Sequence, residues 1–141
     1  MIVRFSGRSV HTVRIKGKPT PEGHKILALC QGGYTYSFLY TSRINSIVGV
    51  QKLDQLTPTS SVAVQLAKTL PYRTRSFNLY MDNYFSNVPL FKHLHALNIG
   101  ACGTAHINSA HFPRVLKVEK NEKLQWNPLT GVVVDYQVLA A

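Results

Sequence analysis

Residues 77–87 read FNLYMDNYFSN, and this stretch decides the fold class of the chain. We expect a strand over residues 76–81, because apolar side chains occupy every second position and would share one side. Asp82 follows the strand directly, and a helix begins a few residues later. A strand that passes through a short polar turn into a helix is typical of α/β domains. The sequence therefore predicts an α/β fold with Asp82 at a strand–helix junction.

Two helices are predicted, one before this strand in the sequence and one after it. The first is capped by Ser60 or Ser61 and stops before Pro71. The second is capped by Ser86 or Asn87. Both carry apolar side chains at helical spacing, namely Val62, Leu66 and Leu70 in the first helix and Leu90, Leu94 and Leu97 in the second. One face of each helix should therefore be buried.

The first third of the chain predicts β-structure. Residues 25–30 and 34–41 have the length and patterning of strands, and the residues between them, Gln31, Gly32 and Gly33, favour a turn. Together they predict an antiparallel hairpin. We expect the end of a strand at residues 1–5, a polar connector at residues 11–23 and a loop at residues 42–59.

The second strand of this hairpin carries an aromatic residue at every other position, in Tyr34, Tyr36, Phe38 and Tyr40. Such a row could stack nucleic-acid bases. More often it forms the inner face of a strand, because aromatic side chains pack well on a half-buried sheet. We therefore expect these four rings in the core.

The last third of the chain is less regular. Residues 101–104 predict a short strand after the second helix. Residues 106–127 alternate in charge without a core pattern, which indicates an exposed insertion or loop. Residues 132–134 and 138–139 are short apolar runs that we interpret as one last strand.

Charge is the most informative feature of the composition. Sixteen Lys and Arg face six Asp and Glu, which gives a formal net charge of +10. This excess predicts a polyanionic partner, and nucleic acid is the common one. The alternative is that basic side chains only make the surface soluble. A chain of 141 residues with 45% hydrophobic residues is long enough to bury one core.

Several classes of function find little support in the sequence. The longest apolar runs are too short to cross a bilayer, and no secretory signal is visible, so we expect no membrane partner and an intracellular setting. Cys30 and Cys102 form neither a disulfide framework nor a zinc pattern. His93 and His95 lie two apart on a predicted helix and would point to different faces. We expect no small-molecule substrate.

Asp82 is the candidate site residue. Ligands of open α/β sheets bind at the carboxyl edge of the strands, where this residue lies. A carboxylate oxygen there suits Mg²⁺ or Mn²⁺. The other interpretation is that Asp82 only accepts a turn hydrogen bond from a nearby backbone N–H. The position of Asp82 alone favours the turn hydrogen bond over a metal-binding role.

Four segments resemble the PiggyBac transposase family, and they do so in the family's order and spacing. Residues 77–87 are similar to the family's Asp-Asn-aromatic-Phe-Ser/Thr segment, which follows a strand and leads into a helix. The others are residues 5–8, similar to its Phe-x-Gly-Arg segment, residues 18–19 with 23–25, similar to its Lys-Pro and Gly-x-Lys lead into a strand, and residues 100–104, similar to its Gly-Thr strand. The resemblance covers most of the chain.

This resemblance implies a partial RNase H-like core of the DDE type, a mixed sheet with flanking helices. In the family, three aspartates hold Mg²⁺ or Mn²⁺ ions that activate water and then a 3′-hydroxyl for attack on DNA phosphodiesters. The outcome is cut-and-paste transposition at TTAA targets. Asp82 matches the second of these aspartates, so the resemblance assigns it a catalytic and metal-binding role.

The chain departs from the family at the other two aspartates. The first would fall just before Met1, and the third lies downstream of Ala141. Asp54 lies in an unpatterned loop and Asp135 has no family motif around it, so neither is a substitute. Two divalent ions carry four positive charges, which one carboxylate cannot balance. We expect weak binding of a single ion at most.

The resulting expectation is one incomplete catalytic domain over residues 1–141 of a truncated transposase-derived protein. Its ancestral DNA cleavage, transposition and integration would be lost in this chain, and it would act in the nucleus with weak, electrostatic DNA contact. Three alternatives stay open. The chain could be a domesticated basic module that binds nucleic acid without cutting it, a partner of a longer transposase, or an incomplete gene model of an active one.

Overall fold

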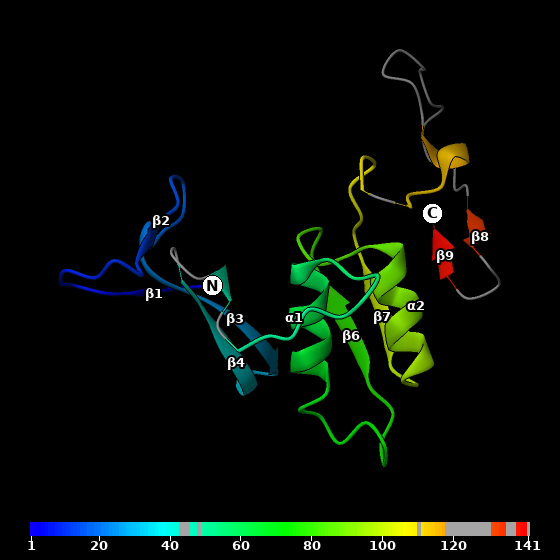
Figure 1. Cartoon of the computed structure of the whole chain (residues 1–141), viewed down its shortest axis with the longest axis horizontal. Coiled ribbons are helices and arrows are strands. Elements are labelled where there is room, and N and C mark those ends of the chain that lie inside the picture. Colours follow the sequence, from blue (N-terminus) through cyan, green and yellow to red (C-terminus); the bar gives the residue numbers. More distant parts are fainter. Residues whose placement is uncertain (43–45, 48, 110, 118–130, 135–137, 141) are drawn as a thin grey trace. The chain divides into compact units, whose positions relative to one another are not determined.

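The computed structural model describes residues 1–42, 46–47, 49–109, 111–117, 131–134 and 138–140 (Figure 1). The chain divides into two compact units. The first comprises Met1–Leu53 and Ser61–Pro71, and the second comprises Asp54–Ser60 and Tyr72–Ala141. The expectation of a single incomplete domain stays a prediction.

The first unit contains an antiparallel sheet built around a long hairpin (Figure 1). Its strands are β1 (Ile2–Arg4), β2 (Val13–Arg14), β3 (Glu22–Gln31), β4 (Tyr34–Ser42) and β5 (Ser46–Ile47). The order is β1-β3-β4-β5, and β2 also pairs with β3. Gly32 and Gly33 both have positive φ, 54° and 84°, as a two-residue hairpin turn requires. The predicted hairpin is confirmed.

The hairpin strand β3 begins three residues earlier than expected, at Glu22. Both β1 and β2 pair with this first part of β3, and Gly23 lies opposite Arg4 on one strand and Val13 on the other. The connector predicted over residues 11–23 therefore contains a strand. The loop predicted over residues 42–59 likewise contains β5. Pairing with neighbouring strands made strands of segments that have no strand pattern of their own.

The aromatic row of β4 is exposed, which makes the prediction of a core position wrong. The exposed fractions are 66% for Tyr34, 46% for Tyr36, 49% for Phe38 and 59% for Tyr40. Period-two alternation groups these residues but does not say which face of a sheet the rest of the chain covers. In this hairpin the core residues are Ile26 and Leu27 of β3, at 7% and 5% exposure.

Helix α1 (Pro58–Ala67) has the predicted apolar face but a different cap. Val62 and Leu66 are buried, and so is Leu70, but α1 ends at Ala67 and not directly before Pro71 as predicted, so Leu70 lies in the turn after the helix. The backbone N–H of Ser60 donates to the Thr57 hydroxyl oxygen at 3.1 Å. A capping side chain accepts a hydrogen bond from the residue three positions later, so Thr57 caps α1. The expected caps, Ser60 and Ser61, are buried residues within the helix. The helix starts earlier because Pro58 is well suited to a first helical position.

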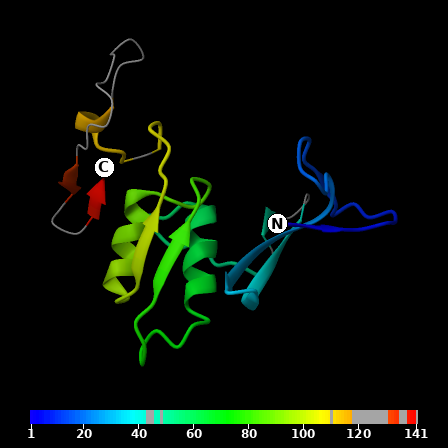
Figure 2. The same ribbon diagram turned by 180° about the vertical axis from the view of Figure 1, so that it is seen from behind.

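The second unit contains β6 (Asn78–Met81), α2 (Val88–Ala96) and β7 (Gly100–Gly103), and Figure 2 shows the two strands side by side with α2 alongside β7. The strands pair in parallel, with Leu79 opposite Ala101. This is a β–α–β unit, in which a strand, a helix and a short strand follow in the predicted order. Asn87 is the cap of α2, and Leu90 and Leu94 on its apolar face are both 0% exposed.

The remaining elements are a 3-10 helix, η1 (Arg114–Leu116), and two strands, β8 (Val132–Val134) and β9 (Val138–Ala140). The strands form an antiparallel pair, so the prediction of one last strand is wrong. The insertion predicted over residues 106–127 is only partly described; residues 106–108 and 111 are exposed, and residues 118–127 lie outside the described part. Among the described residues, no helix is long and apolar enough to cross a membrane.

A candidate catalytic carboxylate at the edge of the β–α–β unit

Asp82 lies at the carboxyl end of β6, directly after Met81. Because β6 and β7 are parallel and Met81 lies opposite Gly103, the carboxyl ends of both strands meet at one edge. The side chain of Asp82 is exposed at this edge. The position predicted from the sequence is therefore the observed one.

The carboxylate of Asp82 takes part in a tight turn. Its Oδ1 atom accepts a hydrogen bond from the backbone N–H of Tyr84 at 3.0 Å. Its backbone carbonyl accepts from the N–H of Ser86 at 3.1 Å and from the Ser86 hydroxyl at 2.8 Å. The turn bond that the sequence favoured is present. This bond engages the Oδ1 atom of the carboxylate.

Asn87 fixes the start of α2 behind this turn. Its Oδ1 atom accepts from the backbone N–H of Leu90 at 2.9 Å, which caps the helix. Its amide nitrogen donates to the Ser60 hydroxyl oxygen at 2.7 Å and to the Phe85 carbonyl at 3.2 Å. One side chain thus ties together the turn, the helix and the start of α1. The sequence indicated the cap but not the bond to Ser60.

Gly103 lets β7 approach this turn closely. A Cβ atom at this position would collide with the Ser86 hydroxyl oxygen and with the Met81 carbonyl. Gly100, at the other end of β7, is equally close to the Asn78 side chain. Sequence reasoning missed the role of both glycines, because the collisions come from a strand about twenty residues away. Their signal was the presence of two glycines in one short strand.

The described residues do not fit a pair of divalent ions at Asp82. Within the ranges that the structure describes, no group of three His, Cys, Asp or Glu side chains is placed to hold a metal ion. Glu119, Glu122 and Asp135 lie outside those ranges. Two ions of charge +2 need several oxygen ligands, and one exposed carboxylate supplies too little charge. The chemistry of Asp82 alone is that of a single weak oxygen ligand.

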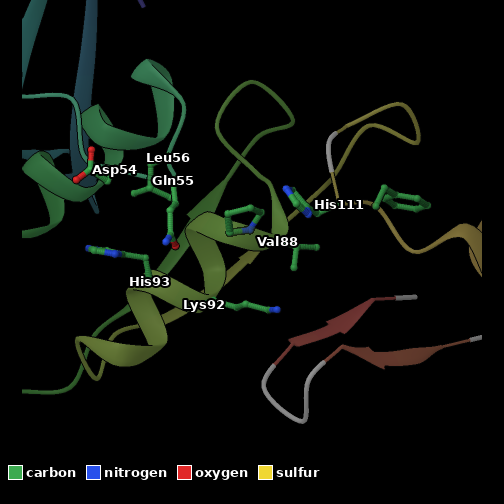
Figure 3. Close-up of a pocket in the computed structure, with 9 residues that line it drawn as sticks. Asp54, Gln55, Leu56, Val88, Lys92, His93 and His111 are labelled. Atoms are coloured by element: carbon green, nitrogen blue, oxygen red, sulfur yellow. The ribbon is translucent and has the colours of Figure 1, made fainter.

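A separate pocket of about 720 Å³ lies in the same unit, and Asp82 does not line it. Figure 3 shows Val88, Lys92 and His93 extending from α2 and His111 from the loop after β7. The other lining residues are Asp54, Gln55, Leu56, Pro89 and Phe112. The Nε2 atom of His93 is buried without a hydrogen-bond partner in the described part of the chain. His95 is exposed, so the two helix histidines face different ways, as predicted.

Comparison with known proteins gave two findings. Residues 1–132 match the model of a protein family described as Transposase IS4. The chain is also similar to a solved structure titled "Cryo-EM structure of piggyBac transposase synaptic complex with hairpin DNA", with a TM-score of 0.65 and 25% sequence identity. That similarity covers 84% of this chain and 24% of the other, so this chain spans about a quarter of that transposase. No curated protein matches.

Proposed function

The chain belongs to the Transposase IS4 family, and on this premise we propose that it is a piggyBac-type transposase-derived protein that contacts DNA without cutting it. The second half of this proposal rests on the ligands around Asp82. This residue lies at the expected strand end, and among the described residues no group of three His, Cys, Asp or Glu side chains is placed to hold a metal ion.

We propose a partial RNase H-like core for this fold. Support comes from the order of elements, an antiparallel sheet followed by a β–α–β unit, and from the structural similarity to a piggyBac transposase. In such a core Asp82 takes the place of the second metal-binding aspartate, as its motif suggests. Mg²⁺ or Mn²⁺ would supply Lewis acidity there when bound. With one carboxylate, we propose weak binding of one ion and no cleavage.

DNA is the partner that the charge of the chain supports. The first unit carries nine Lys and Arg residues against Glu22 as its one acidic residue. The matched piggyBac transposase was solved with hairpin DNA. A basic surface of this kind attracts phosphates of any sequence. We propose nuclear action on this ground, and we propose a longer transposase as a second partner.

A cleavage assay tests the proposed loss of activity. The full chain is incubated with supercoiled plasmid DNA in Mg²⁺ or Mn²⁺, beside the variant Asp82→Asn, which keeps an oxygen for the turn bond to Tyr84. We expect the same absence of nicked or linear plasmid for both proteins. Metal-dependent nicking by the wild type that Asp82→Asn abolishes would overturn the proposal.

A further inference from the structure

A contiguous row of aromatic rings crosses the sheet of the first unit. The centroids of Phe5 and His24 are 4.8 Å apart, those of His24 and Tyr40 are 6.3 Å apart, and those of Tyr40 and Phe38 are 5.6 Å apart. The row thus runs from the chain just after β1, over β3, to β4. The row ends where the pairing of β3 with β4 shifts register, between Leu29 and Cys30. Past this shift, Tyr34 and Tyr36 form a separate pair whose ring centroids are 5.1 Å apart.

Three of the four rings are exposed although they are large and apolar, whereas His24 is half-buried. Phe5 is 40% exposed, Phe38 49% and Tyr40 59%. Contiguous exposed apolar surface of this kind marks a binding site more often than chance exposure does. Neither the Asp82 turn nor the pocket on α2 includes these residues. The row therefore has no part in the site described above.

The geometry of the ring pairs leaves ring faces available. Phe38 and Tyr40 meet edge to face, with 86° between their planes, and Tyr34 and Tyr36 do the same at 80°. In such a pair, the ring that presents its edge keeps both of its faces free of the other ring. A flat π-surface can then stack on these faces. Unpaired nucleic-acid bases are flat π-surfaces that stack on aromatic side chains.

The charge around the row favours a strand of nucleic acid over an apolar protein surface. The unit that carries the row has nine Lys and Arg residues and one acidic residue. Arg4 and Phe5 line the same groove, of about 440 Å³, which Glu22, the one acidic residue of the unit, also lines. Positive charge beside stacking rings is the combination that proteins use to hold single strands. Duplex DNA hides its base faces and would use only the charge.

We infer that the exposed aromatic row of Phe5, His24, Phe38 and Tyr40 is a platform for an unpaired segment of DNA. Bases stack on the rings of β4, and phosphates lie against Arg4 and the basic residues of the same unit. This inference rests on the proposed contact with DNA and adds to it a mode of binding and a preferred form of the ligand. It requires no catalysis by Asp82.

The test compares a 20-nucleotide oligo(dT) strand with a 20-base-pair duplex of mixed sequence, by fluorescence anisotropy at one salt concentration. We expect the full chain to bind oligo(dT) more tightly than the duplex. The double variant Phe38→Ala/Tyr40→Ala should lose roughly 10- to 100-fold in affinity for oligo(dT) and less than about twofold for the duplex. Phe38→Tyr/Tyr40→Phe, which keeps both rings, should bind like the wild type.

Tyr80→Ala is the matched control, because Tyr80 is 81% exposed on β6 in the other unit. It should leave both affinities unchanged, and circular dichroism checks that each variant is folded. If duplex binding persists but the double variant holds oligo(dT) as well as the wild type does, the inference is wrong and the proposed function survives. If neither DNA binds, both are wrong. Tighter binding of oligo(rU) than of oligo(dT), or a dimer that the double variant dissociates, would also overturn the inference.

Discussion

At the scale of single residues, Gly103 decides how closely β7 approaches the turn that holds Asp82. We expect Gly103→Ala to lower the free energy of unfolding by about 1–3 kcal/mol, because the new methyl group would push against the Met81 carbonyl and the Ser86 hydroxyl. Urea unfolding measures the change. Cys102→Ala is the control, since Cys102 is exposed on the same strand and its loss should cost less than about 0.5 kcal/mol. Equal stability of the two variants would refute the close approach.

Asn87 gives a second prediction at this scale. Asn87→Ala removes the cap of α2 and the bond to the Ser60 hydroxyl, so we expect a loss of about 1–2 kcal/mol in the free energy of unfolding. Asn87→Ser restores an oxygen that can cap the helix and should recover most of that loss. Urea unfolding measures the free energies of unfolding of both variants. If the Ser variant is no more stable than the Ala variant, the cap contributes little here.

The place of Asp82 could be predicted from the sequence because it depends on local order alone. A strand, an acidic residue and a capped helix follow one another within about ten residues, and each has its own pattern. The bond from Asn87 to Ser60 could not be predicted, because it joins residues 27 positions apart. The same holds for Gly103, whose neighbours lie in β6 and in the turn that follows it.

At the scale of elements, α2 packs against the rest of its unit through a narrow row of apolar side chains. We expect Leu94→Ala to cost about 2–5 kcal/mol in the free energy of unfolding, because this fully buried side chain would leave a cavity. Leu97 is on the same predicted stripe but is only half-buried, so Leu97→Ala should cost clearly less. Thermal unfolding followed by circular dichroism compares the two. Equal losses would mean that the stripe is not oriented as described.

The existence of the main elements was predictable, whereas several of their ends were not. Helical spacing of apolar residues located α1 and α2, and two glycines between strand patterns located the hairpin. The early start of β3 and the short strands β2 and β5 depend on pairing partners along the chain. The start of α1 was missed because Thr57 competes with Ser60 and Ser61 as a cap, and all three residues have capping side chains.

At the scale of the whole molecule, the charge and the family both support the proposed contact with DNA. Composition alone predicted a polyanionic partner, and membership of a transposase family favours DNA among such partners. What composition could not predict is which surface faces the partner. The aromatic row was expected in the core, because its period is that of any half-buried strand. Only the fold decides which face of a sheet stays uncovered.

The salt dependence of duplex binding tests the central claim, a basic transposase-derived chain that holds DNA without reading or cutting it. We expect a Kd on the order of 10⁻⁴ to 10⁻⁶ M for mixed-sequence duplexes near physiological salt, with the logarithm of affinity falling linearly with the logarithm of salt concentration. Unrelated duplexes should give the same line. An affinity that does not change with salt, or a strong preference for one duplex sequence, would contradict the claim.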